Sequence, residues 1–259
     1  MSKAFATIAD WATVFAAPDD ALWRLEERGY QPALEHEVES CFAISNGFLG
    51  VRASLEQPMV GSRPRTFIAG LFDTAPGEMP LPKLVSGPDW LRFQLLVAGE
   101  PVALETGQTL AHGRMIDFRR GVLRGEWRQR DPGGRIVRLR TLRFVSLANR
   151  ALAVQVVWIE IDQPALLTLE AWIEPPSDGL CLIGPEPNVQ VWRTAHAAKQ
   201  LAVASTMTLR LDVQKIQRVS DDFGRSIWRW NATPGQPAIF ARIVAFARGD
   251  ADGDAASAA

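Results

Sequence analysis

The chain has 259 residues, with 28 basic and 29 acidic side chains and a net charge of −1. Hydrophobic residues make up 47% of it and charged residues 22%, a composition that fits a packed globular protein and excludes a largely disordered one. The small net charge disfavours nucleic acid or an anionic membrane as the main partner, because those surfaces are bound through a large basic excess. At this length, one large all-β domain is allowed.

The first residues and the cysteines point to the cell interior. Asp10 interrupts the apolar run of residues 4–17, so we expect no signal peptide, and no stretch has the ~18 uninterrupted apolar residues of a membrane span. Cys41 and Cys181 have no partner at metal-ligand spacing, so we expect two buried free thiols and no metal site. A cytoplasmic protein without cofactor is predicted.

Two segments near the start carry clear local signals. Residues 19–28, followed by Gly29, show the best helical pattern of the chain. Asn46-Gly47 is typical of a type I′ hairpin turn, which would pair Ile44 with Leu49 and Phe42 with Val51. We therefore predict one short helix and then a hairpin with four apolar side chains on one face.

Further along the chain, strand signals dominate. The turn residues of 130–135 predict a second hairpin with strands near 122–130 and 135–145. Residues 151–161 are apolar on both faces apart from Gln155 and Glu160, which is typical of a central strand. Other apolar runs of strand length are 66–72, 91–97, 166–173, 189–193, 201–206, 209–213, 227–230 and 239–247. We expect one β domain over residues 1–248.

Residues 249–259 are small and polar, which predicts a flexible, linker-like tail. The aspartates at 250, 252 and 254 resemble a calcium loop. However, Gly253 takes the wrong place in it and no glutamate follows, so no calcium site is expected.

Few residues carry a signal for chemistry. His36 lies among Glu35, Glu37 and Glu39, and it is either a positioned base or, as we favour, part of a solvated charged approach to the hairpin. Ten arginines lie between residues 119 and 150, against Glu126 and Asp131. They form either a surface for phosphate or an acidic partner or, as we favour, a face covered by acidic residues from elsewhere in the chain.

Tryptophan is frequent, with nine in the chain. Trp228 and Trp230 share one face of a predicted strand and are candidates for stacking on a sugar ring. Core packing is nevertheless the favoured interpretation for most of the tryptophans.

Five ordered blocks of the sequence resemble a known family. These are Glu39–Phe42 with Asn46–Arg52, Arg65–Asp73, Leu84–Trp90, Asp117–Arg124 and Arg143–Ser146. Together they resemble the opening of family 65 glycoside hydrolases, which include maltose, trehalose and kojibiose phosphorylases. Ala53 and Ser86 depart from the usual Gly and Asn of that pattern, as in a divergent member.

The resemblance implies a fold and a role. It implies a large two-sheet antiparallel β-sandwich of the supersandwich, galactose-mutarotase-like type, with few short helices. In the family this domain is non-catalytic and precedes an (α/α)6 barrel, which carries the catalytic acid and the phosphate-binding residues. No catalytic residue can therefore be assigned to this chain, whose expected partner is a catalytic barrel domain or subunit in carbohydrate metabolism.

Other roles remain open at this stage. A free carbohydrate-binding module and a mutarotase-like sugar enzyme are the alternatives, and a homodimer is allowed. The Pro-rich segment 73–90, which we expect to be a long loop, is the candidate partner interface. Its candidate residues are Asp73, Leu81, Leu84 and Trp90.

Overall fold

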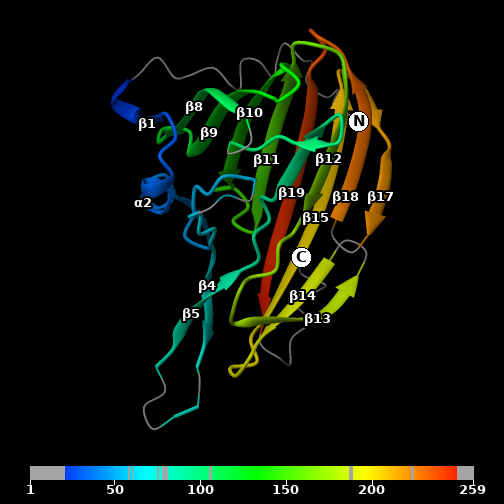
Figure 1. Ribbon diagram of the computed structural model, residues 1–259. Coiled ribbons are helices and arrows are strands. Elements are labelled where there is room, and N and C mark those ends of the chain that lie inside the picture. Colours follow the sequence, from blue (N-terminus) through cyan, green and yellow to red (C-terminus); the bar gives the residue numbers. More distant parts are fainter. Residues whose placement is uncertain are drawn as a thin grey trace.

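The computed structural model describes residues 21–57, 59, 61–74, 76–77, 81–104, 107–186, 189–222 and 225–249. One layer of the molecule is a ten-stranded antiparallel sheet (Figure 1). From edge to edge its strands are β1 (Arg24–Arg28), β8 (Gln108–Asp117), β9 (Val122–Arg130), β10 (Ile136–Val145), β11 (Leu152–Ile161), β19 (Ala238–Gly249), β15 (Gln200–Leu211), β14 (Val189–Thr194) and β13 (Leu180–Glu186), with β16 (Gln214–Ile216) paired to β15.

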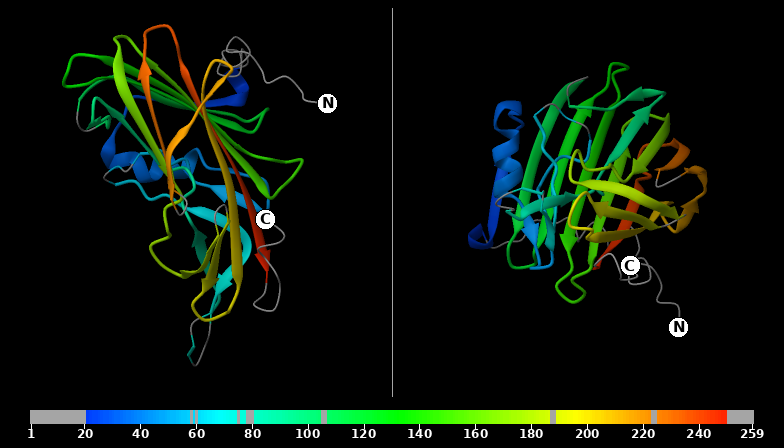
Figure 2. Two further views of the ribbon diagram at one scale, coloured as in Figure 1. Left: turned by 90° about the vertical axis from the view of Figure 1, so that its right-hand side faces the viewer. Right: turned by 90° about the horizontal axis from the view of Figure 1, so that it is seen from below.

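Two smaller antiparallel sheets form the opposite layer (Figure 2). The five-stranded sheet has the order β17 (Arg218–Asp222), β18 (Arg225–Ala232), β12 (Ala165–Trp172), β6 (Phe93–Val97) and β7 (Glu100–Pro101), and the four-stranded sheet has the order β2 (Ile44–Ser45), β3 (Leu49–Val51), β4 (Thr66–Asp73) and β5 (Lys83–Gly87). Helical segments are short: η1 (Ala21–Trp23), η2 (Pro32–Leu34) and α2 (Glu35–Cys41). The all-β sandwich is confirmed, and its second layer is divided in two.

Each small sheet packs its own core against the large sheet. The four-stranded sheet places Ile68 and Leu71 against Val244 and Phe246 of β19. The five-stranded sheet contributes a second cluster of buried side chains, which includes Trp228 packed edge-to-face on Phe240 of β19. The sandwich therefore has two apolar cores side by side, one under each small sheet.

The strand periodicity follows from these cores. On β12 the side chains of Leu167, Leu169 and Ala171 are buried and those between them are not, as the alternation predicts. β11 lies between β10 and β19, so the predicted central strand is confirmed. Its two polar exceptions face opposite ways. Gln155 is buried between the layers, and Glu160 lies on the outer face beside arginines of β10.

The first hairpin forms in a register different from the predicted one. Ile44 pairs with Val51, and the Asn46 N–H donates to Leu49 O at 3.1 Å, so Gly47 and Phe48 are the central turn residues. Only Gly47 of these has a positive φ, +85°. Asn46 Oδ1 accepts the N–H groups of Phe48 and Leu49, which stabilises this turn over type I′. The four apolar side chains still share the core, because the shift preserves their face.

Several other boundaries differ from the predictions. Residues 24–28 form strand β1, paired with β8, instead of continuing a helix, because pairing at the sheet edge overrides local helical preference. Residues 83–87 form β5 inside the expected long loop, and β15 joins the two strands predicted at 201–206 and 209–213. Gly249 ends β19, whereas the rest of the predicted tail and the calcium-like aspartates lie outside the described residues.

Candidate docking surface

The clearest projection from the body is the hairpin of β4 and β5, which extends away from the sandwich (Figures 1 and 2). We call β4, β5 and the described residues between them the arm. Ile68, Leu71 and Val85 bury one side of it in the core. Leu81 is 77% exposed, Leu84 43% and Phe72 41%. These three exposed side chains, of which Phe72 and Leu84 are cross-strand partners, are called the apolar side of the arm, and the described chain leaves them uncovered.

The arm bends at Gly70, where the β4–β5 register shifts between Phe67 and Phe72. Gly70 has φ +77°, and a Cβ atom at this position would overlap the guanidinium of Arg248 on β19. Glycine adopts this φ without strain and leaves room for the Arg248 side chain. The bend is thus specified by the sequence, and the Arg248 side chain near the end of β19 packs against it.

Asp73 fixes the end of β4 to the β14–β15 turn. Its carboxylate accepts the N–H of His196 at 3.0 Å and that of Ala197 at 2.6 Å, and its second oxygen lies 3.0 Å from His196 Nδ1. Burial raises the pKa of Asp73, but these hydrogen bonds outweigh it and lower the pKa to about 2. Asp73 is therefore an anchor of the arm, ionised at neutral pH.

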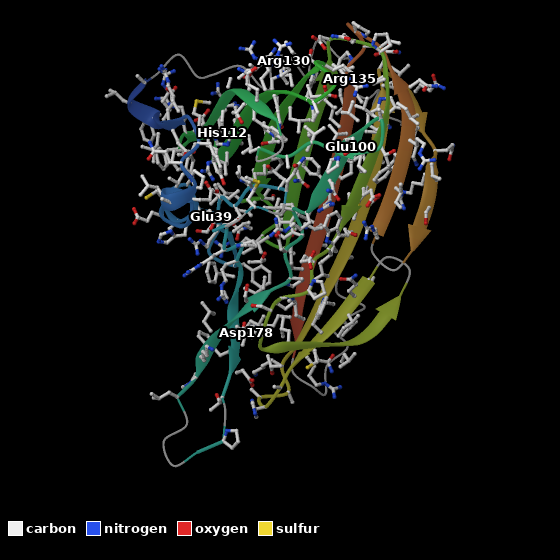
Figure 3. The ribbon with its side chains drawn as sticks, viewed as in Figure 1. Glu39, Glu100, His112, Arg130, Arg135 and Asp178 are labelled. Carbon is white, nitrogen blue, oxygen red and sulfur yellow. The ribbon has the colours of Figure 1, made fainter. Side chains whose placement is uncertain are left out.

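A polar groove of about 470 Å³ lies at the base of the arm. Residues 62–65 form one wall, residues 174–177 the other, and Ser86, Gly87 and Asp89 also line it. Beside it, Asp178 lies 3.9 Å from both Arg65 and Lys83, where the arm leaves the body (Figure 3). The groove and the apolar side of the arm thus border the same part of the molecule.

Trp90 does not belong to this surface. It is 0% exposed and packs in the core under the four-stranded sheet, so the prediction that it contributes to a partner interface is wrong. Residues 88–92 cross between the two small sheets, and their backbone carbonyls are buried there. Asp89 makes an antiparallel bridge with Glu174 in this seam, and the large indole of Trp90 is buried beside it.

A row of polar side chains on the large sheet satisfies the carbonyls of the seam. Arg143, Gln155 and Arg242 are cross-strand neighbours on β10, β11 and β19. Arg242 donates to Trp90 O and to Arg92 O, and Gln155 Nε2 donates to Leu91 O at 2.9 Å. These groups separate the two apolar cores, and each donor removes the cost of an unpaired buried carbonyl.

Charges in the seam are buried with their partners. Arg143 donates to Ser54 O at 2.8 Å, and Arg92 Nε lies 2.8 Å from Asp89. Burial raises the pKa of Asp89 and lowers the pKa of Arg143 and that of Arg242. In each case the pKa shifts in the direction that desolvation of the charged form produces. These groups therefore belong to the interior of the sandwich.

The predicted sugar-stacking pair is also interior. Trp228 is 0% and Trp230 5% exposed, and both belong to the core under the five-stranded sheet, so they cannot stack on a ligand at the surface. Two less buried indoles, of Trp23 and Trp172, each lie under an arginine, at 5.3 Å from Arg119 and 5.1 Å from Arg225. Among the described tryptophans, Trp23 alone is exposed, at 45%, and Arg119 lies over its ring.

Several arginines of the arginine-rich region form ion pairs within the chain. Arg120 and Arg124 bind Asp117, and Arg135 binds Asp131. On the outer face of the sheet, Arg138 pairs with Glu126 and Glu160, and Arg140 pairs with Glu160. Acidic residues from outside 119–150 supply part of this pairing, as favoured from the sequence. Figure 3 places Arg130 and Arg135 at the far end of the molecule from Asp178 and the arm.

The segment around His36 is helix α2, which leads into the first hairpin and is solvated on one side only, at His36 and Glu37. Glu35 and Glu39 are fully buried, whereas His36 is exposed and uses its carbonyl to accept from Arg52. Glu39 accepts from Ser62 and from the Arg63 N–H. The carboxylates of Glu35 and Glu39 are therefore buried and Glu37 is exposed like His36, an arrangement that does not favour a positioned base.

Arg114 of β8 forms a buried ion-pair cluster that sequence reasoning missed. Its guanidinium binds Glu27 at 2.6 Å and Glu35 at 2.7 Å and donates to Ala53 O at 2.9 Å. Burial lowers the pKa of Arg114, but the two carboxylates raise it above its ordinary value. The sequence analysis predicted neither β1 nor β8 as a strand, so it did not bring Arg114 and Glu27 together.

The described residues contain no group of three or more His, Cys, Asp or Glu side chains able to hold a metal ion. Cys41 and Cys181 are free thiols, but both are exposed, which corrects the expectation of burial. None of the helices in the described ranges has the length and apolar character required to cross a membrane.

Comparison with known proteins places these features in a family. The glycosyl hydrolase family 65 N-terminal domain matches residues 25–259. A kojibiose phosphorylase of Caldanaerobacter subterraneus subsp. tengcongensis is 34% identical over 131 residues, 51% of this chain and 17% of the relative. One from Thermoanaerobacter brockii is 27% identical over 191 residues, 73% of this chain and 23% of the relative.

A solved structure also shares this fold. A protein assigned as a kojibiose phosphorylase, from the human microbiome, superposes with a TM-score of 0.76 at 14% identity, over 90% of this chain and 33% of that one. The chain thus spans about a fifth of the length of these curated relatives and a third of the solved one. It belongs to glycosyl hydrolase family 65, in which it corresponds to the N-terminal domain.

Proposed function

We propose that this chain is a non-catalytic domain that packs on a catalytic (α/α)6 barrel and so serves carbohydrate metabolism. The family match supports the proposal, because the matched segment is the N-terminal domain of much longer relatives. The role would be to present a rigid surface to the barrel and to frame the entrance to its active site.

The observation that carries the proposal is the uncovered apolar side of an anchored arm. Leu81 and Leu84 are exposed, while Asp73 fixes the end of β4, the other strand of the arm, to the β14–β15 turn. Ordering a hairpin this firmly while leaving leucines in water is unfavourable unless a partner covers them. Of the candidate interface residues, Asp73, Leu81 and Leu84 remain in the proposal and Trp90 does not.

The alternatives have less support. A carbohydrate-binding module that stacks sugars on Trp228 and Trp230 conflicts with the burial of both rings. A mutarotase-like enzyme needs a histidine and a carboxylate directed to a substrate, whereas His196 and Asp73 bind each other at the base of the arm. The homodimer and the cytoplasmic location stay predictions from the sequence.

The test is affinity purification of the chain from extract of its own cells, with identification of every co-purifying polypeptide. An antibody against the domain also reports whether it occurs as a 28.5 kDa chain or within a longer one. We expect a catalytic family 65 segment in the purified material, on the same polypeptide or another. Purification of the short chain without any such segment would contradict the proposal.

A further inference from the structure

We infer that the chain has a binding site for one ring of a neutral polyhydroxylated compound, such as a hexose, on the outer face of its large sheet. The site is a hollow of about 230 Å³ formed by β1, β8, β9 and β10, which lie side by side at one end of that sheet (Figure 1). It shares no lining residue with the polar groove at the base of the arm. The inference therefore concerns a ligand of this chain itself and does not depend on packing against a barrel.

The hollow arises at Gly113 of β8. Cross-strand pairing places Gly113 between Arg28 of β1 and Glu126 of β9. The row continues to Arg140 of β10, whose ion pair lies on the outer face, so the whole row faces outward. Glycine leaves a gap in this row, and a Cβ atom at position 113 would lie only 2.9 Å from Glu27 O. The close pairing of β1 with β8 thus requires the residue that keeps the gap open.

The hollow combines hydrogen-bond acceptors and donors with an apolar side chain. Glu26 and Glu126 supply carboxylate oxygens, and the guanidiniums of Arg124 and Arg140 supply N–H groups. Arg124 is 8% exposed, so its place is fixed by the surrounding side chains. Met115 is half-buried and pairs across the strands with Glu26 and Arg124, which adds a thioether to the lining. A concave surface with apolar contacts and a few placed polar groups is typical of small-molecule sites.

The charges around the hollow already have partners within the chain. Glu26 lies 3.1 Å from Arg28, and Arg124 lies 3.4 Å from Asp117. An ion of either sign would compete with one of these pairs and would meet a like charge elsewhere in the lining. A hydroxyl group donates to a carboxylate and accepts from a guanidinium, so it adds hydrogen bonds without separating a pair. A neutral compound with several hydroxyl groups therefore fits the hollow best.

The volume limits the ligand to a single ring. At about 230 Å³ the hollow is smaller than the roughly 300–1,000 Å³ of sites for drug-sized ligands. A hexose carries hydroxyl groups around the edge of its ring and C–H groups on its faces. Its edge suits the charged walls, and a face suits Met115. Because a ring in a surface hollow makes few contacts, we expect a Kd on the order of 1 mM.

Methyl-labelled methionine provides a direct probe of the site. The chain has five methionines, of which Met115 lines the hollow and Met207 is buried in the core under the five-stranded sheet. The isolated chain, labelled with ¹³C at its methionine methyl groups, is titrated with glucose and followed by NMR. We expect a saturable shift of the Met115 methyl signal and none of the Met207 signal. Absence of a saturable Met115 shift at glucose concentrations far above the expected Kd would overturn the inference.

A charge-removing variant locates the site. Glu126→Gln keeps the size of the side chain but removes its charge, and it should weaken glucose binding roughly tenfold, because hydrogen bonds to charged groups are the strong ones. Glu100→Gln, on the exposed strand β7, is the matched control and should leave the Kd unchanged. Equal glucose affinity for Glu126→Gln and the wild type would overturn the hollow as the site. Glu126 is half-exposed, so its replacement keeps the fold.

Filling the hollow gives a readout that does not use the Met115 methyl group. Met115→Trp places an indole in the hollow, whereas the control Ile243→Trp places one at an exposed position of β19. An unchanged Met207 signal checks that each variant is folded. Saturation transfer from the protein to glucose should be lost in Met115→Trp and retained in Ile243→Trp. Transfer that persists in folded Met115→Trp would place the bound sugar elsewhere and overturn the inference.

Other ligands test the chemical class. Inorganic phosphate and glycine represent an anion and a zwitterion, and a saturable Met115 shift with either of them but not with glucose would overturn the neutral polyol as the ligand. All these measurements use the isolated chain. Their failure would leave the proposed packing on a barrel intact, and failure of the co-purification experiment would leave this site intact.

Discussion

Replacing Gly47 by valine tests the turn that joins β2 to β3. Gly47 has φ +85°, and a Cβ atom there would have no heavy atom within 4 Å. The substitution therefore introduces backbone strain without a steric clash. The left-handed conformation costs a non-glycine residue about 1–2 kcal/mol, and a β-branched side chain is at the upper end.

A smaller opposing effect comes from the unfolded state. Valine restricts the unfolded chain more than glycine does, which stabilises the protein by about 0.4–1 kcal/mol. The net expectation for Gly47→Val is a loss of about 1 kcal/mol or slightly more. For a protein of this size that lowers Tm by roughly 2–4 °C.

The assay is urea unfolding followed by tryptophan fluorescence, with Gly77→Val as the matched control. Gly77 is exposed, has an ordinary φ and also has open space around its Cβ position, so only the unfolded-state term should act there. We expect the two variants to shift the midpoint in opposite directions. An unchanged or raised midpoint for Gly47→Val would refute the turn geometry.

Three further predictions concern the interior and the arm. Arg114→Met should cost about 3–5 kcal/mol, because it leaves the buried Glu35 without its cation. Arg138 is half-exposed, so Arg138→Met should lower the unfolding free energy by about 1 kcal/mol or less. Equal urea midpoints for the Arg114 and Arg138 variants would contradict this difference. In Asp73→Asn, stability should fall at neutral pH, because the folded-state pKa of Asp73 is about 2 against an ordinary 3.8. The difference from wild type should be full above pH 3.8 and vanish as the pH falls through 2, and a constant difference in urea midpoint would refute the role of the carboxylate. Leu81→Ser should change the unfolding free energy by no more than about 0.5 kcal/mol, and Trp90→Ser should lower it by about 3 kcal/mol or more. The reverse order in calorimetry would place Leu81 in the core.

Periodicity and turn residues predicted much of the large sheet. β9, β10, β11 and β19 were expected near their observed positions, because alternating burial and short turns are local properties of the sequence. β1 was missed, since its charged sequence suits a helix and becomes a strand only by pairing with β8. That pairing is not visible in the local sequence.

The candidate site was predictable only in part. Leu81 and Leu84 were expected at the surface and are exposed there, but Trp90 lies six residues from Leu84 and is fully buried. The difference arises because residues 88–92 cross the seam between the small sheets, where Arg242 and Gln155 bind their carbonyls. Such contacts join residues more than 60 positions apart, so no local pattern reveals them.

The most direct test of the proposed function is a phosphorolysis assay on two preparations from the same cells. The isolated chain and the co-purified assembly are each given maltose, trehalose or kojibiose with phosphate, and release of glucose 1-phosphate is measured. We predict product from the assembly with one of these α-glucosides and none from the isolated chain. Phosphate-dependent release by the isolated chain, after traces of other enzymes are removed, would contradict a non-catalytic role.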